Sequence, residues 1–430
     1  MPKQLFFLRQ RPSFFLLIAL VLMIAAGSAF PQTTAIRVGN LVDPSAGTIA
    51  KNQVILVKEG KIVEVGPKVN IPAGSEVIDL MNAWVMPGLM DAHTHITLDD
   101  LNMSTGLDVI FLRESSAMRA LRGLRTAQDI LRAGFTVVRD VGNDANYASV
   151  DIRDAIRKGW FIGPTVLTTG KIIAPFGGQT RRLPPEQGPF WLYEYIDADT
   201  VDEVRKAVRQ NIYYGADAIK LVSDNSAFYY TEAEIRAAVE EAHAAGLAVS
   251  VHVMGGEAAR NVILGGADSI EHGFYLSDEL LQLMKEKGIW LVGTEFPQAH
   301  LEKLDPAGAM GQAKEAAAKY IDRLKRAYKI GVKMAFGTDS VSNLPGKNRG
   351  DMMLDYLDMW DAAGVPPAST LKAMTTNAAE LLRIEKVRGS IAKGMAADII
   401  ATPGNPLENI QVLRQVSFVM KDGKVVKPKN

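Results

Sequence analysis

Strand-like and helix-like segments alternate through most of this 430-residue chain, and this alternation restricts its fold more than any other feature. Helical patterns such as 231–245 and 313–329 separate most of the apolar segments, and Thr231 with Glu234 fits a capping box. After a first strand that ends near Ala92, the candidate strands are 136–141, 165–169, 218–222, 248–253, 268–271, 289–293 and 333–336. Eight β/α units over roughly 300 residues predict an α/β protein with a (β/α)8 TIM barrel, and a doubly wound sheet is the alternative.

The two ends of the chain have a different pattern, in which short apolar strands flank tight turns. One hairpin pattern surrounds Glu59-Gly60-Lys61, and a similar one surrounds Lys421-Asp422-Gly423-Lys424 near the C-terminus. We therefore expect both ends to pair in one small β-sandwich domain beside the barrel. The predicted boundaries are 35–86 and 386–428 for the two parts of the sandwich and 87–385 for the barrel.

The first residues have the pattern of a secretory signal peptide. Basic residues precede the apolar run 14–26, and the small residues 27–29 follow it. The run is short for a bilayer span. We therefore predict a signal peptide over residues 1–29 and a periplasmic or secreted protein with no stable membrane insertion after cleavage. An uncleaved membrane anchor is the alternative.

Composition narrows the classes of function. The chain has 48 basic and 48 acidic residues, so its charge balance does not support nucleic-acid or general membrane-surface binding. Because it contains no cysteine, disulfides and thiolate metal ligands are excluded. A hydrophobic content of 47% is ample for a large core. Composition therefore leaves a small-molecule substrate open as the partner and gives no support for a nucleic acid.

Metal-binding residue types lie at the ends of several predicted strands. His93 and His95 are two residues apart after the first strand, so both rings can reach one ion. His252 lies in the fifth strand, His272 follows the sixth, and Asp339 follows the eighth. Each residue alone could be structural, but barrel active sites lie at the carboxyl ends of the strands. Together the five side chains therefore indicate a metal site.

Lys220 lies inside the apolar fourth strand, between Ile219 and Leu221. A charged amine is costly to bury in such surroundings, although a lysine can also extend its amine to solvent. An amine with a lowered pKa can instead react with CO2 to form a carbamate. The two carbamate oxygens could bridge two divalent ions, which would explain a lysine at this place.

These motifs together resemble the amidohydrolase superfamily, in particular the branch of imidazolonepropionase-like proteins, Xaa-Pro dipeptidases and ochratoxin-type amidohydrolases. The resemblance covers residues 35–426, which is nearly all of the chain after the signal segment. Besides the strand with Lys220, the matching motifs are 87–95, 251–253, 269–273, 337–339, 375–382 and 389–398. This combination is specific for the superfamily and less specific for the dipeptidase branch.

The resemblance implies a binuclear site, with Zn²⁺ as the default metal. A hydroxide between the two ions would be the nucleophile, and Asp339 would accept its proton and pass it to the leaving amine. Barrels of this family are commonly oligomeric, so a homo-oligomer is one expectation. The first ion would be bound by His93, His95, Lys220 and Asp339, and the second by Lys220, His252 and His272.

The implied reaction is hydrolysis of an amide C–N bond in a dipeptide or an N-acyl amino acid. A mononuclear deaminase or cyclic-imide hydrolase is the main alternative, and Lys220 argues against it because one ion needs no bridging carbamate. Hydrolysis of lactones or organophosphates is open to the same nucleophile. A scaffold without activity is less favoured, since every expected ligand is present.

Three further residues are candidates for substrate contact. Tyr230 resembles a family tyrosine that contacts substrate, with Tyr229 as a rival and packing as the alternative role. Gln179 follows two glycines where dipeptidase relatives tend to carry histidine, and Arg349 precedes a glycine where they also carry histidine. Arg349 could hold a carboxylate, or it could be an exposed surface arginine. The Pro-, Gly- and aromatic-rich region 174–200 is expected to be a long loop beside the pocket.

The remaining polar residues near these motifs receive a structural interpretation. We expect His243 and His300 to lie at the surface without a role in the site. Arg139 and Asp140 follow the second strand as neighbours and are expected to form a structural pair.

Overall fold

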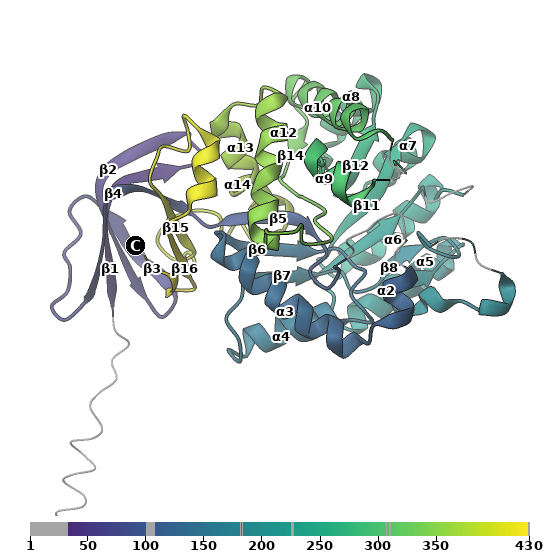
Figure 1. The fold of residues 1–430 in the computed structure, drawn as a ribbon, viewed down its shortest axis with the longest axis horizontal. Helices are drawn as coiled ribbons and strands as arrows, with labels where there is room; N and C mark the ends of the chain where they lie inside the picture. Colours follow the sequence, from purple (N-terminus) through teal and green to yellow (C-terminus); the bar gives the residue numbers. More distant parts are fainter. Residues whose placement is uncertain are drawn as a thin grey trace, which may run out of the picture.

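The computed structural model describes residues 33–99, 108–180, 182, 184–224, 228–306, 308 and 311–428. A small β unit lies beside a larger α/β unit, as Figure 1 shows. The predicted signal peptide, residues 1–29, lies outside the described residues. Within the described part, the helices are too short or too polar to cross a bilayer.

The small unit is one seven-stranded sheet in the order β17-β16-β15-β4-β1-β2-β3. Antiparallel pairing of β4 with β15 joins the N-terminal and C-terminal strands. Ile62 N also donates to Met395 O (2.8 Å), so the sheet curls round an apolar core that includes Phe418. Its strands are β1 (Thr34–Asp43), β2 (Thr48–Lys58), β3 (Lys61–Gly66), β4 (Glu76–Pro87), β15 (Ile399–Thr402), β16 (Phe418–Lys421) and β17 (Lys424–Lys427).

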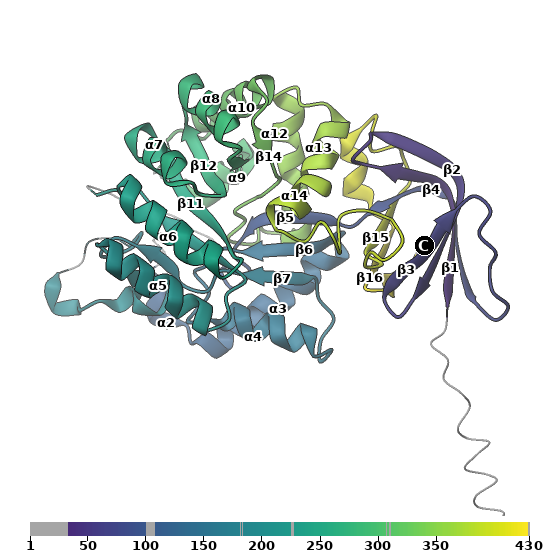
Figure 2. The same cartoon turned by 180° about the vertical axis from the view of Figure 1, so that it is seen from behind.

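The larger unit consists of parallel strands surrounded by helices (Figures 1 and 2). Its strands form two sheets, β5-β6-β7 and β14-β13-β12-β11-β10-β8-β9. Several strands are buried on both faces, which explains why they appear as continuous apolar runs in the sequence. The strands are β5 (Leu89–Thr94), β6 (Phe135–Asp140), β7 (Thr165–Thr168), β8 (Ile172–Ala174), β9 (Tyr195–Asp197), β10 (Ala218–Val222), β11 (Ala248–Gly255), β12 (Ser269–Tyr275), β13 (Trp290–Val292) and β14 (Lys333–Met334).

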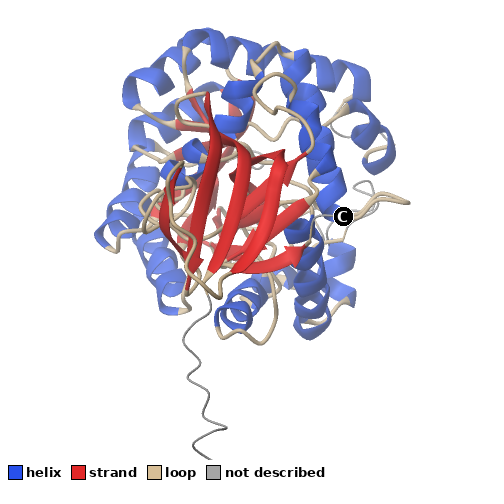
Figure 3. Ribbon diagram, turned by 90° about the vertical axis from the view of Figure 1, so that its left-hand side faces the viewer, coloured by secondary structure: helices blue, strands red, loops and turns tan. Residues whose placement is uncertain are grey.

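Helices cover the outside of these strands, and Figure 3 shows them ringing the sheets when the molecule is viewed from the side of the small unit. The capping box predicted for α6 is present, since Thr231 and Glu234 each accept the other's backbone N–H. The helices are α2 (Asp108–Arg113), α3 (Ser116–Arg132), α4 (Ala148–Arg157), α5 (Val201–Tyr213), α6 (Glu232–Ala244), α7 (Gly256–Gly265), α8 (Asp278–Lys287), α9 (Gln298–Leu304), α10 (Ala313–Ile330), α11 (Arg349–Met353), α12 (Leu357–Ala362), α13 (Pro367–Ala373) and α14 (Thr376–Leu381). Short 3-10 helices are η1 (Pro185–Gln187), η2 (Phe190–Tyr193), η3 (Leu354–Tyr356) and η4 (Ile410–Gln415).

Backbone hydrogen bonds link the two parallel sheets where their edges meet. On one side, Ala92 N donates to Phe336 O (2.9 Å) beyond the end of β14. On the other side, Asp217 N donates to Thr168 O (2.7 Å), where β7 meets the start of β10. The α/β class with parallel strands is confirmed. The strand ladders do not run round as one closed sheet in the described residues, so the closed barrel stays a proposal.

The region 174–200 differs from the predicted irregular loop. It contains η1 and η2, and β9 lies at its end as the edge strand beside β8. The third predicted strand is also shorter, because the chain turns at Gly170 in a left-handed conformation (φ 64°) before β8 joins the other sheet. Strands of three residues are too short for an alternating pattern to identify.

Candidate metal centre

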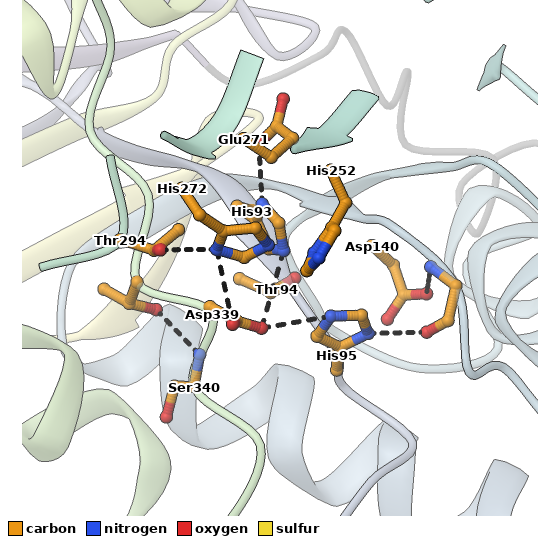
Figure 4. A network of polar contacts seen from close by, with 12 residues as sticks. His93, Thr94, His95, Asp140, His252, Glu271, His272, Thr294, Asp339 and Ser340 are labelled. Atoms are coloured by element: carbon orange, nitrogen blue, oxygen red, sulfur yellow. Dashed lines mark hydrogen bonds and ion pairs between the residues drawn. The ribbon is translucent and has the colours of Figure 1, made fainter. Parts of the chain in front are cut away.

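Side chains from β5, β11, β12 and the segment after β14 meet at the carboxyl ends of the strands (Figure 4). Oδ1 of Asp339 lies 3.1 Å from Nε2 of His95 and 3.4 Å from Nε2 of His93. One ligand atom from each of these three residues lies within 4.8 Å of the others. Imidazole nitrogens and a carboxylate oxygen at this spacing suit a zinc-like divalent ion.

Asp339 is held as a carboxylate in this cluster. Burial alone would raise its pKa, but the imidazoles of His93, His95 and His272 hold the pKa well below its usual range. Its backbone is in the left-handed region (φ 53°), and Asp339 N donates to His93 O at 2.8 Å. The strained conformation and the low pKa, which keeps the group ionised, both suit a metal ligand.

The second pair of histidines lies beside this cluster. The ring centroids of His252 and His272 are 4.5 Å apart, and those of His272 and His93 are 4.9 Å apart. Burial and the nearby Lys220 charge lower the pKa of His252 to about 3, and burial with His252 lowers the pKa of His272 well below normal. Both imidazoles are therefore neutral, which is the form that binds metals.

Lys220 completes the predicted ligand set from β10. Its side chain is 2% exposed, and Nζ has no hydrogen-bond partner in the described part of the chain. Burial lowers the pKa of Lys220 to about 8, so a neutral amine is within reach near neutral pH. A buried amine without a partner fits a carbamate-forming lysine, because the oxygens of the carbamate could then bind metal ions.

Glu271 supports the centre and was missed in the sequence. Its Oε2 accepts from Nδ1 of His93 (2.6 Å), while Oε1 accepts from Arg139 Nη2 (2.8 Å). Burial would raise the pKa of Glu271, but the Arg139 charge and the His93 contact lower it to about 2. The carboxylate therefore fixes the His93 tautomer and leaves Nε2 for a metal. An acidic residue inside an apolar strand beside His272 is the signal that could have identified it.

Backbone groups orient His95 in a similar way. Nδ1 of His95 donates to Gly142 O at 2.7 Å, which directs Nε2 towards Asp339. Asp140 holds the adjacent chain by accepting from Ile96 N (2.7 Å). Arg139 and Asp140 thus have structural contacts, as expected, but they act separately, because Arg139 binds Glu271 and each residue supports a different histidine.

The three candidates for substrate contact lie in different surroundings. Gln179 is beside the centre, with Nε2 at 3.4 Å from both ring nitrogens of His252. Tyr230 is 2% exposed, and its hydroxyl donates to Ala198 O at 2.8 Å. Its neighbour Tyr229 is 49% exposed. The contacts therefore bring Gln179 to the metal centre and give Tyr230 a packing role.

Arg349 is not the exposed arginine of the alternative interpretation. It is 1% exposed, and its guanidinium donates to the backbone oxygens of His95, Ser340 and Leu98. Nε donates to the Asn343 side chain at 3.3 Å. With four donations inside the protein, the geometry gives Arg349 the role of fixing the loops around His95 and Asp339 and provides no support for carboxylate binding.

His300 also differs from its predicted surface position. The side chain is buried, and Nε2 lies 2.9 Å from Oδ2 of Asp355. His243 contacts Asp268 at 2.8 Å and is partly exposed. The contacts of His300 and His243 are thus with Asp355 and Asp268, which lie outside the predicted ligand set.

Comparison with known proteins identifies the family. Residues 84–426 match the Amidohydrolase family. Ochratoxinase from Aspergillus niger is 31% identical over 445 residues, which cover 94% of this chain and 89% of that protein. Imidazolonepropionase from Shewanella sp. (strain ANA-3) is 27% identical, covering 87% and 93%. The crystal structure of a Xaa-Pro dipeptidase with bound methionine in the active site aligns with a TM-score of 0.80 at 30% identity, covering 92% and 99%.

The chain belongs to the amidohydrolase family, as the motifs predicted. It is a hydrolase that acts on carbon–nitrogen bonds of the amide type in small molecules. Members of this family generally bind metal ions, and the cluster of His93, His95 and Asp339 is the candidate site for one.

Proposed function

We propose that this protein is a binuclear metal-dependent amidohydrolase that cleaves a dipeptide or an N-acyl amino acid. Its two linked parallel sheets would act as the predicted (β/α)8 barrel, with the site at the carboxyl ends of the strands. The main support is Lys220, a buried lysine whose amine has no hydrogen-bond partner in the described residues. A site for one ion has no need of such a lysine.

The donor set divides into two groups that share Lys220. His93, His95 and Asp339 would hold one ion, while His252 and His272 would hold the other. A carbamate on Lys220 would supply one oxygen to each. Divalent ions such as Zn²⁺ acidify bound water and polarise a carbonyl when present.

Asp339 is the residue that can move a proton. It is a carboxylate, and its Oδ1 is engaged by the histidine nitrogens at 3.1 and 3.4 Å. Oδ2 is less closely held, at 3.8 Å from Nδ1 of His272. We assign to Oδ2 the acceptance of a proton from water and its transfer to the leaving amine.

The substrate class is supported by the relatives. One similar structure is that of a Xaa-Pro dipeptidase, and one similar protein is an ochratoxinase. The similarity to an imidazolonepropionase supports a second candidate, the hydrolysis of a cyclic imide-like ring at a single ion. Lys220 favours the first candidate.

Metal content of the purified protein tests this proposal. We also propose that residues 1–29 direct export and are removed, so the chain for this experiment begins after them. It should be supplied with zinc and bicarbonate and then assayed with dipeptides and N-acyl amino acids. About two ions per chain, with amide hydrolysis, is the expected result. About one ion with ring-opening activity would favour the second candidate, and a chain without metal would contradict both.

A further inference from the structure

Two different loops contact the two groups of histidines. Gly142, directly after β6, accepts the hydrogen bond from Nδ1 of His95 at 2.7 Å. Gln179, in the segment after β8, places its Nε2 3.4 Å from the His252 ring nitrogens. Each group of ligands is thus oriented by a separate part of the chain, and their relative position depends on how these two parts are joined.

Tyr195 at the start of β9 joins them. Asn143 Nδ2 donates to the Tyr195 hydroxyl (3.1 Å), and this hydroxyl donates to Oε1 of Gln179 (3.4 Å). The phenol is 1% exposed, so both hydrogen bonds are shielded from water. A hydrogen-bonded path therefore runs from the loop that holds His95, through one hydroxyl, to the amide beside His252.

Packing gives this path little freedom. Gly178 packs closely against the Tyr195 ring. A Cβ at this position would lie 2.5 Å from a ring atom, so a larger residue would not fit. Gly178 also has a left-handed backbone (φ 53°), which a larger residue adopts with strain. Gln179, the next residue, is therefore placed by the ring as well as by the hydroxyl.

The loop on the other side of Tyr195 is held in a strained conformation. Asn143 (φ 52°), Ala145 (φ 56°) and Asn146 (φ 65°) all have positive φ without being glycine. The buried Arg119 donates to Asn143 O and pairs with Glu194, whose Oε2 accepts from Ala145 N at 3.3 Å. Such a loop keeps its shape only because its surroundings determine it, and Glu194 is the residue before Tyr195.

We propose that Tyr195 is a positioning residue that joins the two halves of the metal centre, by holding Gln179 against His252 while it anchors the loop of His95. This inference rests on the proposed binuclear site. It does not require any particular substrate, because the effect acts on the metal ligands themselves.

Tyr195→Phe tests the proposal, since it removes the hydroxyl and keeps the ring that packs on Gly178. The main measurement is release of zinc from the loaded protein to a competing chelator. We expect the chelator concentration for half release to fall about three- to tenfold, less than for a group bonded directly to a ligand, because Tyr195 acts through Gln179 and Asn143. Where a substrate has been identified, KM should rise about fivefold with a smaller change in kcat.

Tyr147→Phe is the matched control. Tyr147 is also a buried tyrosine, and its hydroxyl donates to Oδ1 of Asn211 (2.9 Å) on α5, outside the path from Asn143 to Gln179. Its loss should lower the melting temperature by a similar amount and leave zinc release unchanged. Equal effects of the two variants on zinc release would overturn the proposal.

A double variant separates positioning from general loosening. In a Gln179→Ala background, Tyr195→Phe should change zinc release and KM less than it does in the unsubstituted chain, because only the contact with Asn143 is then left to lose. Additive effects would overturn that route. An unsubstituted chain that binds no zinc would contradict the proposed function itself, a result distinct from zinc binding that is insensitive to Tyr195.

Discussion

The two halves of the candidate metal centre differ in how completely other protein groups hold their ligand side chains in place. In the first half, His93, His95 and Asp339 bring their ligand atoms within 4.8 Å of one another. Glu271 and Gly142 bind the second nitrogens of the two histidines. In the second half, Lys220, His252 and His272 lie together, but Nζ of Lys220 has no hydrogen-bond partner among the described residues.

This difference indicates two ways of making a metal site. Glu271 and the Gly142 oxygen hold the two histidines of the first half, so its geometry should persist when one support is changed. In the second half, Nδ1 of His272 lies 2.8 Å from Thr294 Oγ1 and Gln179 lies beside His252, but Lys220 has no such support among the described residues. The second half depends on Lys220. A carbamate on this lysine would explain why the amine is buried and why its pKa is lowered. The first half should therefore bind its ion more tightly, and the following predictions test that order.

The largest effect is expected from Asp339→Asn. The amide keeps the shape of the carboxylate but cannot accept the proton, so kcat should fall about a thousandfold or more. At least the ion of the second half should remain, which metal analysis of the variant would show. Asp398→Asn is the control, because Asp398 is buried in the small unit and pairs with Lys421. An active Asp339→Asn enzyme would remove this residue from the proposed mechanism.

Lys220→Ala should lower metal content and activity together, with the second half affected first. Short carboxylic acids such as formate or acetate should restore part of the activity, because they can replace the carbamate between the ions. Activity and metal content are measured with and without the acid. Lys421→Ala is the control, because it removes another buried lysine, which lies in β16 of the small unit. The acids should not restore activity lost in this variant. Full activity of Lys220→Ala would contradict the bridging role.

Glu271→Gln should weaken the first half without abolishing it. The amide cannot match the charge of the carboxylate that accepts from His93, so metal affinity should fall about 10- to 100-fold. Affinity is measured by chelator competition at constant pH. Glu295→Gln is a matched control, since Glu295 is equally buried and pairs with Arg323 at 2.8 Å. Equal losses in the two variants would mean that Glu271 acts only on stability.

The smallest effect is expected from Tyr230→Phe. Its hydroxyl donates to Ala198 O, so the variant should lose about 1 kcal/mol of unfolding free energy and change KM less than about twofold. Denaturant unfolding and steady-state kinetics give the two values. A KM raised about tenfold at unchanged stability would restore the substrate role suggested by the family resemblance.

The outcome for individual residues shows where sequence reasoning succeeded. The side chains of His93, His95 and Asp339 meet as expected, because the carboxyl ends of parallel strands share one edge. His300 was expected at the surface and is buried, and Arg349, a candidate for carboxylate binding or an exposed arginine, is buried against backbone oxygens. A single arginine or histidine outside a periodic pattern has no local signal for burial, since burial depends on which distant segments pack over it.

The sequence by itself determined the family, the parallel α/β class and the residue types available for metal binding. All three depend on motifs and on local periodicity, which are properties of short stretches of chain. Only the tertiary structure decided which groups orient those ligands. Glu271 and His93 are 178 residues apart, and Tyr195 meets Gln179 and Asn143 from a third element. Such contacts result from how the strands and loops pack together, and no local pattern encodes that packing.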